Sequence, residues 1–160
     1  MSFVSLQKAK RELFLFGLFK IRLLLFCSPK LIRIDENEVL LRIPLNWRTK
    51  NHLGVMYFGA LAVGADIAGG FHAFSFARNK GIKISLLFKS FNAQFLKRAE
   101  SDVYFHSSSG QVVSEMLENS KSSGERINQT IPIRAFVMQN GEEETVAEFK
   151  LEVSVKVLTE

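Results

Sequence analysis

Residues 56–78, MYFGALAVGADIAGGFHAFSFAR, are too long and too apolar to form a single strand. Their many alanines favour an α-helix, although Gly64, Gly69 and Gly70 weaken that preference. A helix that is apolar on all sides has to be buried on all sides. In a chain of 160 residues, only a sheet that curls around the helix can bury it in this way.

The rest of the chain supplies strands for such a sheet. The hairpin signal Asn140-Gly141 lies between two strand-like segments, and both of its residues tolerate positive φ. In the last segment apolar and polar side chains alternate, so one face should meet the core and the other water. We expect an α+β fold with an antiparallel sheet. The predicted strands are residues 31–35, 39–45, 82–91, 102–106, 131–139 and 145–157, with a short helix at 111–119.

A second apolar segment, residues 13–27 (LFLFGLFKIRLLLFC), lies near the N-terminus. It is short for a membrane span, which needs about 20 apolar residues, and Lys20 and Arg22 interrupt it. We interpret residues 7–26 as a buried amphipathic helix that ends before Pro29, because proline disfavours helix in the residue before it. Weak contact with a membrane surface and a cleaved signal or membrane span are the alternatives.

Composition restricts the function further. The net charge is +5, but the basic residues are spread along the chain, which argues against a nucleic-acid partner and leaves a phosphorylated ligand as an alternative. The 15 phenylalanines indicate an apolar interior or groove. Cys27 is the only cysteine, which favours a reducing, cytoplasmic location. The spacing of the three histidines gives no metal site.

Asp66 is the one formally charged residue between Lys50 and Arg78. Burying an isolated carboxylate costs several kcal/mol, so stability alone gives no reason for it. It is either a catalytic group or a buried acid held by a hydrogen bond, for example from Ser75 or a strand backbone. Its neighbours at helical spacing are small and leave room for close packing or for a ligand: Gly59, Ala62, Gly69, Gly70 and Ala73.

Residues 51–66, NHLGVMYFGALAVGAD, resemble the motif of hotdog-fold thioesterases, which include the 4-hydroxybenzoyl-CoA thioesterase-like enzymes. The phenylacetate-pathway-like branch has Asn-x-x-Gly-x-x-His-Gly-Gly-x-x-x-x-x-x-Asp, and an uncharacterised bacterial branch without the His-Gly-Gly is closer still. The resemblance implies one hotdog domain over residues 1–160, with residues 1–28 as a helical segment packed on it. Asn51, Gly54, Gly59 and Asp66 match in register, whereas Tyr57 and Phe58 replace His and Gly.

The resemblance also implies the chemistry, which is hydrolysis of an acyl-CoA or acyl-carrier thioester. Asp66 would act as general base or nucleophile, the amide of Phe58 beside Gly59 would hold the carbonyl oxygen, and Asn51 would position substrate or water. No cofactor is implied, since coenzyme A comes with the substrate. Further candidates for substrate contact are Tyr57 and His52, the basic residues Arg78, Lys80, Lys97 and Arg98 for phosphates, and Phe71, Phe74 and Phe88 for the acyl chain.

The spacing of these groups predicts an oligomer. Asp66 lies eight residues beyond Phe58, or roughly 12 Å along a helix. One thioester carbon cannot touch both groups of the same chain, so the amide has to come from a second subunit. This agrees with the family, whose sites lie at dimer interfaces, and we expect a homodimer or a dimer of dimers.

Two other functions stay open. His52 precedes Asp66 by fourteen residues, as the histidine and acid do in hotdog dehydratases, but the Pro-Gly that opens their helix is absent and their acid is usually Glu. The second alternative is a non-catalytic acyl or lipid carrier, which the many phenylalanines and the altered His-Gly-Gly favour.

Overall fold

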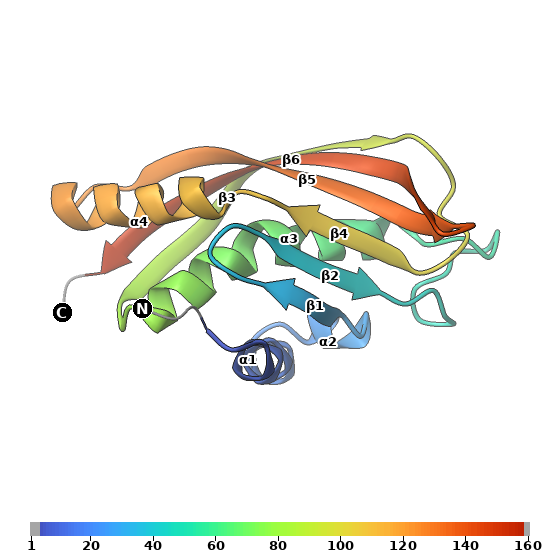
Figure 1. The fold of residues 1–160 in the computed structure, drawn as a ribbon, viewed down its shortest axis with the longest axis horizontal. Helices are drawn as coiled ribbons and strands as arrows, with labels where there is room; N and C mark the ends of the chain where they lie inside the picture. The colour runs from blue at the N-terminus through green and yellow to red at the C-terminus, as the bar shows by residue number, and fades with distance from the viewer. Residues whose placement is uncertain (1–3, 159–160) are drawn as a thin grey trace.

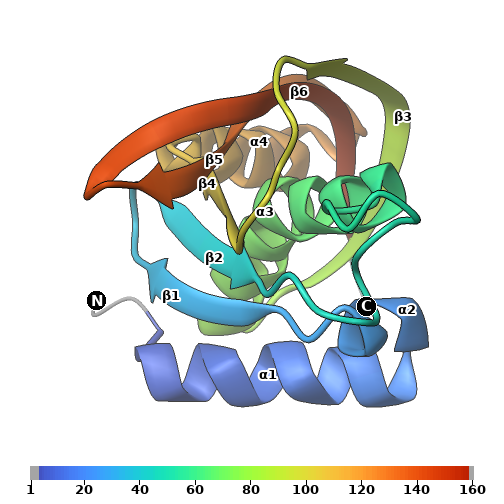
Figure 2. The same cartoon turned by 90° about the vertical axis from the view of Figure 1, so that its right-hand side faces the viewer.

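A long helix, α3 (Phe58–Asn79), runs through the centre of the molecule, and a six-stranded antiparallel sheet curves around it (Figures 1 and 2). The structure, a computed structural model, describes residues 4–158. The predicted α+β class with a sheet wrapped around a central helix is confirmed. The other elements are α1 (Leu6–Phe19), α2 (Arg22–Phe26), β1 (Lys30–Ile34), β2 (Val39–Ile43), β3 (Lys83–Phe95), β4 (Val103–Ser107), α4 (Gly110–Ser123), β5 (Ile127–Gln139) and β6 (Glu142–Leu158).

The strands follow the order β1-β2-β4-β5-β6-β3. The β5–β6 hairpin turns at Asn140 and Gly141, both of which have positive φ, as the sequence predicts. Three predicted strands were too short: β3 continues to Phe95, β5 begins at Ile127 and β6 begins at Glu142. The strands are longer than predicted because polar residues near their ends continue the backbone pairing, of β3 with β6 and of β5 with β6.

Small residues let α3 lie close to the sheet. A Cβ on Gly64 would lie 2.3 Å from the Phe105 ring of β4, and one on Gly69 would lie 3.1 Å from Leu151 of β6. By length and composition α3 could cross a membrane, but 83% of its most apolar window is buried inside the fold. The helix is therefore the core of the domain, and Gly64 and Gly69 are packing residues on the sheet side.

The alternation in β6 places Phe149, Leu151, Val153, Val155 and Val157 in the core, as predicted. Ser154 lies on the opposite face of β6 and is also buried. The Arg126 guanidinium donates to the Ser154 carbonyl oxygen at 3.1 Å. The solvent face of β6 is therefore covered at this point.

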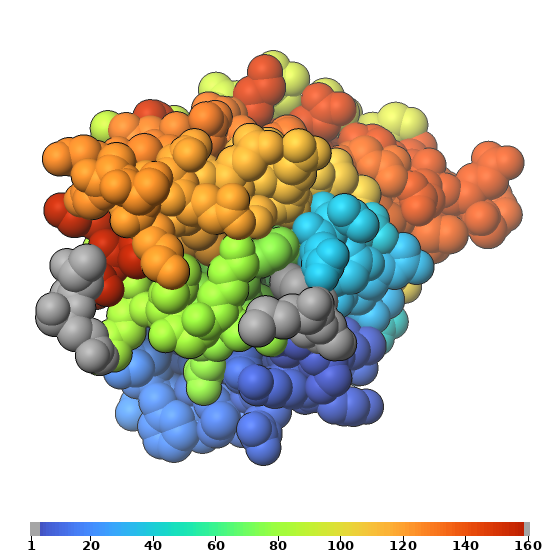
Figure 3. All heavy atoms as spheres, turned by 60° about the vertical axis from the view of Figure 1, so that its left-hand side comes forward, coloured from blue at the N-terminus to red at the C-terminus, as the bar shows by residue number. Residues whose placement is uncertain are grey.

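The N-terminal segment differs from the single helix predicted over residues 7–26. The helix breaks at Lys20 and Ile21, whose amides both donate to the Phe16 carbonyl, and α2 folds back against α1. Gly17 permits this approach, because a Cβ there would lie 3.1 Å from Leu25 Cβ. The two helices form a layer below α3 and β1, with one face buried and the other exposed (Figures 2 and 3). The prediction of a buried helix is wrong for that outer face.

Candidate active site

An apolar cavity of about 370 Å³ lies between α1, α2, α3 and β3. Its wall on α3 includes Asp66, and Asp66 is the one ionisable residue in the lining. Three phenylalanines that the sequence analysis assigned to the acyl chain, Phe71, Phe74 and Phe88, line the same cavity. The remaining lining residues are apolar or glycine: Leu13, Phe16, Ile21, Leu24, Ile67, Gly70, Leu86 and Leu87.

The cavity side of α3 depends on a glycine. A Cβ on Gly70 would lie 2.9 Å from Cζ of Phe88, so the phenyl ring of β3 can lie against the helix because position 70 has no side chain. The small residues at helical spacing from Asp66 therefore have two different structural roles. Gly69 packs on the sheet, whereas Gly70 leaves the space beside the carboxylate to an aromatic ring.

The surroundings of Asp66 make it a stronger base than an ordinary aspartate. Burial raises its pKa to about 6, because the apolar surroundings disfavour the charged form. Within residues 4–158 we find no hydrogen bond or ion pair to its carboxylate. The alternative of a structural bond from Ser75 fails, since that buried hydroxyl has no hydrogen-bond partner in the described chain.

The N-terminus of α3 is exposed and available to a ligand. Tyr57 is the N-cap and Phe58 is the first helical residue, and no side chain caps the helix. The Tyr57 carbonyl accepts from Ala60 and Leu61, while among the described residues no bond is made to the amides of Phe58 and Gly59. Two N–H donors at the positive end of a 22-residue helix can stabilise an oxyanion.

Aromatic rings surround these two donors. The Tyr57 ring lies over Gly59, where a Cβ would approach Tyr57 Cε1 to 2.4 Å. The Tyr57 and Phe58 ring centroids are 4.7 Å apart, and Phe58 meets Phe95 of β3 edge-on at 6.4 Å. Both Tyr57 and Phe58 are exposed. With Tyr-Phe in place of His-Gly, the two amides thus lie beside apolar aromatic surface.

Asn51 has a local role in the loop before α3. Its side-chain oxygen accepts from the Leu53 amide at 2.9 Å, and its backbone N–H donates to Val55 at 2.8 Å. Gly54 completes the turn with φ of +79°, which explains the Asn-x-x-Gly spacing. His52 is exposed on this turn and lies outside the cavity lining. The structure therefore does not place Asn51 or His52 beside Asp66 of the same chain.

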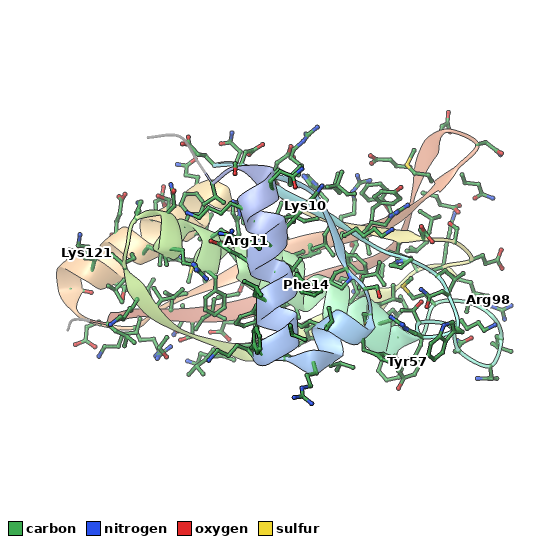
Figure 4. The ribbon with its side chains drawn as sticks, turned by 90° about the horizontal axis from the view of Figure 1, so that it is seen from below. Lys10, Arg11, Phe14, Tyr57, Arg98 and Lys121 are labelled. Carbon is green, nitrogen blue, oxygen red and sulfur yellow. The ribbon has the colours of Figure 1, made fainter. Side chains whose placement is uncertain are left out.

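The basic candidates do not form one site. Arg78 and Lys80, at the C-terminal end of α3, pair with Glu12 and Glu118. Lys97 and Arg98 lie near the N-terminal end of α3. The neighbouring Ala99 carbonyl accepts a hydrogen bond from the amide of Met56, which comes just before α3. Lys97 pairs with Glu144. Figure 4 shows Arg98 at the same end of the molecule as Tyr57.

The sequence analysis missed the part of the cavity wall that α1 and α2 supply. Leu13, Phe16, Ile21 and Leu24 close the side of α3 that the sheet leaves open, and the Phe16 and Phe74 rings lie 5.4 Å apart. The apolar spacing of residues 13–24 was visible in the sequence. Their position over Asp66 could not be read from it, because it depends on the break at Lys20.

A long helix wrapped by an antiparallel sheet is the hotdog fold. A protein-family model described as a domain of unknown function, DUF4442, matches residues 23–156, and the chain belongs to that family. The resemblance to the phenylacetate-pathway-like branch stays a prediction. Among curated proteins, no sequence matches the chain.

Solved structures with the same fold have little sequence in common with the chain. A protein of unknown function from Chlorobaculum tepidum is 12% identical, with a TM-score of 0.80 over 94% of this chain and 95% of its own. A probable thioesterase from Pseudomonas aeruginosa is 16% identical, with a TM-score of 0.75 over 98% and 99%. A thioesterase from Haemophilus influenzae is 15% identical, with a TM-score of 0.67 over 100% and 98%.

Proposed function

We propose that the protein hydrolyses acyl thioesters, with Asp66 as the general base or nucleophile. The observation that carries the proposal is the carboxylate of Asp66, alone among ionisable groups in an apolar cavity large enough for an acyl chain. Of the solved structures with this fold, one is named a probable thioesterase and another a thioesterase, which supports the same reaction class.

The raised pKa suits the carboxylate for proton transfer. A general base works best with a pKa near the working pH, and about 6 is closer to neutrality than the ordinary value of 3.8. Once ionised, Asp66 would take a proton from water as the water attacks the acyl carbon, or would attack that carbon itself. In the first case the thiolate of the carrier leaves and takes up the proton that Asp66 removed from water. In the second case the thiolate leaves an acyl anhydride on Asp66, and water then cleaves this anhydride to the free acid, restores the carboxylate and supplies the proton for the thiolate.

The second half of the site would come from a second copy of the chain. β3 is an edge strand of 13 residues with Leu87, Phe88, Phe91 and Phe95 exposed. An exposed apolar edge of this length normally pairs with another strand. The opposite edge, β1, is covered by α1 (Figure 2). We therefore propose a homodimer in which the two β3 strands pair antiparallel.

Such pairing would bring the two catalytic parts together. The Lys83 end of β3 follows the C-terminus of α3, whereas its Phe95 end packs on Phe58 at the N-terminus of α3. Antiparallel pairing about the middle of β3 sets the Phe95 end of one strand beside the Lys83 end of the other. The Phe58 and Gly59 amides of one subunit would then approach Leu86 and the Asp66 cavity of its partner.

The substrate would be an acyl-CoA or an acyl-carrier thioester with an apolar acyl group. Its chain would occupy the cavity, whose lining offers no polar side chain other than Asp66. Arg98 is the best placed of the basic candidates for a phosphate, because it is exposed close to the N-terminus of α3 and has no ion pair among the described residues.

A second function, acyl binding without turnover, is favoured by one specific observation. The aromatic rings of Tyr57 and Phe58 surround the start of α3, where a thioester would have to approach the amides. In that case the cavity would hold a fatty acid or acyl chain as cargo. The same experiment separates the two functions.

The test measures hydrolysis of a panel of acyl-CoA thioesters of increasing chain length by release of free thiol. Asp66→Asn should lower turnover by roughly 10²–10⁴. The matched control is Glu142→Gln, which removes a carboxylate from the exposed β5–β6 hairpin and should leave turnover unchanged. Turnover by Asp66→Asn equal to that of the wild type would refute the role of Asp66, and co-purified fatty acid without hydrolysis would favour the carrier.

A further inference from the structure

The outer face of α1 and α2 is an exposed apolar surface. Phe19 is 73% exposed, Leu23 is 60% exposed and Trp47, in the loop after β2, is 71% exposed. Apolar patches of this kind on a protein surface mark interaction sites. We call this surface the N-terminal face, and its large apolar residues are Phe14, Leu15, Leu18, Phe19, Ile21, Leu23, Phe26 and Trp47.

Aromatic contacts join the parts of the N-terminal face. The Phe26 ring of α2 meets the Trp47 ring edge-on, with centroids 6.1 Å apart. The Arg48 guanidinium lies 5.1 Å from the centroid of Trp47 and 5.7 Å from that of Phe26. It also donates to the Ser28 hydroxyl at 3.2 Å. The surface therefore continues from α2 to the loop after β2.

The charge of the chain is concentrated in the same segment. Residues 1–34 contain seven Lys and Arg and one acidic residue, Glu12, whereas residues 35–160 contain 14 basic and 15 acidic residues. Glu12 is buried and pairs with Arg78, so it does not reach the N-terminal face. Lys10 and Arg11 project from α1 beside Phe14 (Figure 4). The exposed part of α1 and α2 thus carries basic and apolar side chains without an acidic one.

A helix with one basic and apolar face is the form that lies in the plane of a bilayer. Its apolar side chains enter the region between headgroups and acyl chains, and its basic side chains meet anionic headgroups. α1 has 14 residues and is roughly 21 Å long, and α2 continues the same layer. The opposite face of α1 is already fixed to the domain by Ala9, Leu13 and Gly17, which are buried.

We propose that the N-terminal face docks the protein on the surface of an anionic lipid bilayer. The domain would stay outside the membrane, because α3 is enclosed by the sheet. We choose a bilayer as the partner because the basic side chains of the face match negative headgroups and its apolar side chains match acyl chains. The proposal is independent of the thioesterase activity, since the apolar residues of the N-terminal face other than Ile21 do not line the cavity.

Trp47 provides a reporter for the test, because it is the only tryptophan and belongs to the N-terminal face. The full-length protein is mixed with vesicles of phosphatidylcholine alone or with about one-third phosphatidylglycerol, a fraction chosen to give a negative surface potential. We expect co-sedimentation and a blue shift of the tryptophan emission with the anionic vesicles. Both should weaken as the salt concentration rises, because salt screens the surface charge.

Two variants and one control separate the contributions. Lys10→Glu/Arg11→Glu should weaken binding to anionic vesicles tenfold or more, since each basic residue near such a surface contributes about 1 kcal/mol. Phe19→Ser/Leu23→Ser should reduce the blue shift. Lys121→Glu/Lys150→Glu changes the net charge by the same amount away from the N-terminal face and should bind like the wild type.

Three results would overturn the proposal. The first is a wild-type protein that does not bind anionic vesicles at low salt. The second is equal loss of binding in the Lys121→Glu/Lys150→Glu control, which would show a response to net charge alone. The third is a blue shift of the tryptophan emission that occurs without lipid, grows with protein concentration and is accompanied by a rise in molecular mass. Phe19→Ser/Leu23→Ser would abolish both the blue shift and the rise in mass. That result would assign the face to a second copy of the chain.

Discussion

The buried carboxylate of Glu12 on α1 pairs with Arg78 at the C-terminal end of α3, with Oε1 and Nε 3.3 Å apart. Arg78 is largely exposed, so its loss removes little packing but leaves Glu12 unpaired in the interior. We expect Arg78→Ala to lower the free energy of unfolding by about 1–3 kcal/mol. Glu12→Leu/Arg78→Ala should recover most of that loss in urea unfolding, and a double variant no better than Arg78→Ala would contradict this account.

The pH dependence of hydrolysis follows from the pKa of Asp66. Its carboxyl has a pKa of about 6 and has to be ionised to act as base or nucleophile. We expect kcat/KM to rise tenfold per pH unit up to about pH 6 and then to level off. The profile is measured between pH 4.5 and 8 with one acyl-CoA substrate. A rate already constant from pH 4.5 upwards would mean that a carboxyl of ordinary pKa does the work.

The same shift predicts a pH-dependent gain in stability for Asp66→Asn. The folded state holds the proton of Asp66 more tightly than the unfolded chain does, so folding stability falls as pH rises from about 4 to about 6 and stays reduced above that. Removing the charge should raise the free energy of unfolding at pH 7.5 by up to about 3 kcal/mol.

The gain should be small near pH 4, where Asp66 is protonated in the folded state and is still partly protonated in the unfolded chain. Urea unfolding of the wild type and Asp66→Asn at pH 4 and pH 7.5 checks this expectation. Glu142→Gln is the matched control, because it removes an exposed carboxylate and should not change the pH dependence. Equal destabilisation of Asp66→Asn at both pH values would show that the carboxylate has a structural bond.

The proposed oxyanion donor can be removed without removing the helix. Phe58 is the first residue of α3, a position where proline is tolerated because its amide has no partner within the helix. Phe58→Pro should therefore fold but lose turnover by roughly 10²–10³, whereas Phe58→Ala keeps the amide and should stay active. Circular dichroism verifies the helix in both variants.

The proposed sharing of the site between two subunits predicts an outcome that is specific to a dimer. When Asp66→Asn and Phe58→Pro chains are refolded together, half of the dimers are mixed, and each of these has one intact and one doubly defective site. Activity should return to about one quarter of the wild-type level. If activity does not return on mixing, then either the Asp66 carboxylate and the Phe58 amide of one site belong to the same chain, or the Phe58 amide has no role.

Strong local patterns predicted most of the fold. The apolar run of α3, the Asn140-Gly141 turn and the alternation in β6 each depend on neighbours in the chain, and the structure confirms all three. The break between α1 and α2 was missed, because it depends on the contact of Gly17 with Leu25 rather than on a helix-breaking residue. The start of β5 at Ile127 was missed, because the polar residues that follow Ile127 do not look like a strand in the sequence but still pair with β6.

The candidate site was predictable in part. An acid in an otherwise apolar helix pointed to Asp66, and its cavity contains the predicted Phe71, Phe74 and Phe88. The roles of Asn51, Arg78 and Lys97 could not be judged from sequence, since their partners are a turn amide, Glu12 and Glu144. The net charge of residues 1–34 was visible in the sequence, because their seven basic residues are accompanied by a single acidic one.

The family match begins at residue 23, after the end of α1, yet α1 supplies Leu13 and Phe16 to the cavity. One side of the chamber is thus formed by a piece of chain outside the matched segment. Exchanging this helix among relatives would alter the depth and width of the chamber while the sheet and Asp66 stay in place. In the proposed thioesterase, selectivity for the length of the acyl chain can therefore evolve separately from the chemistry.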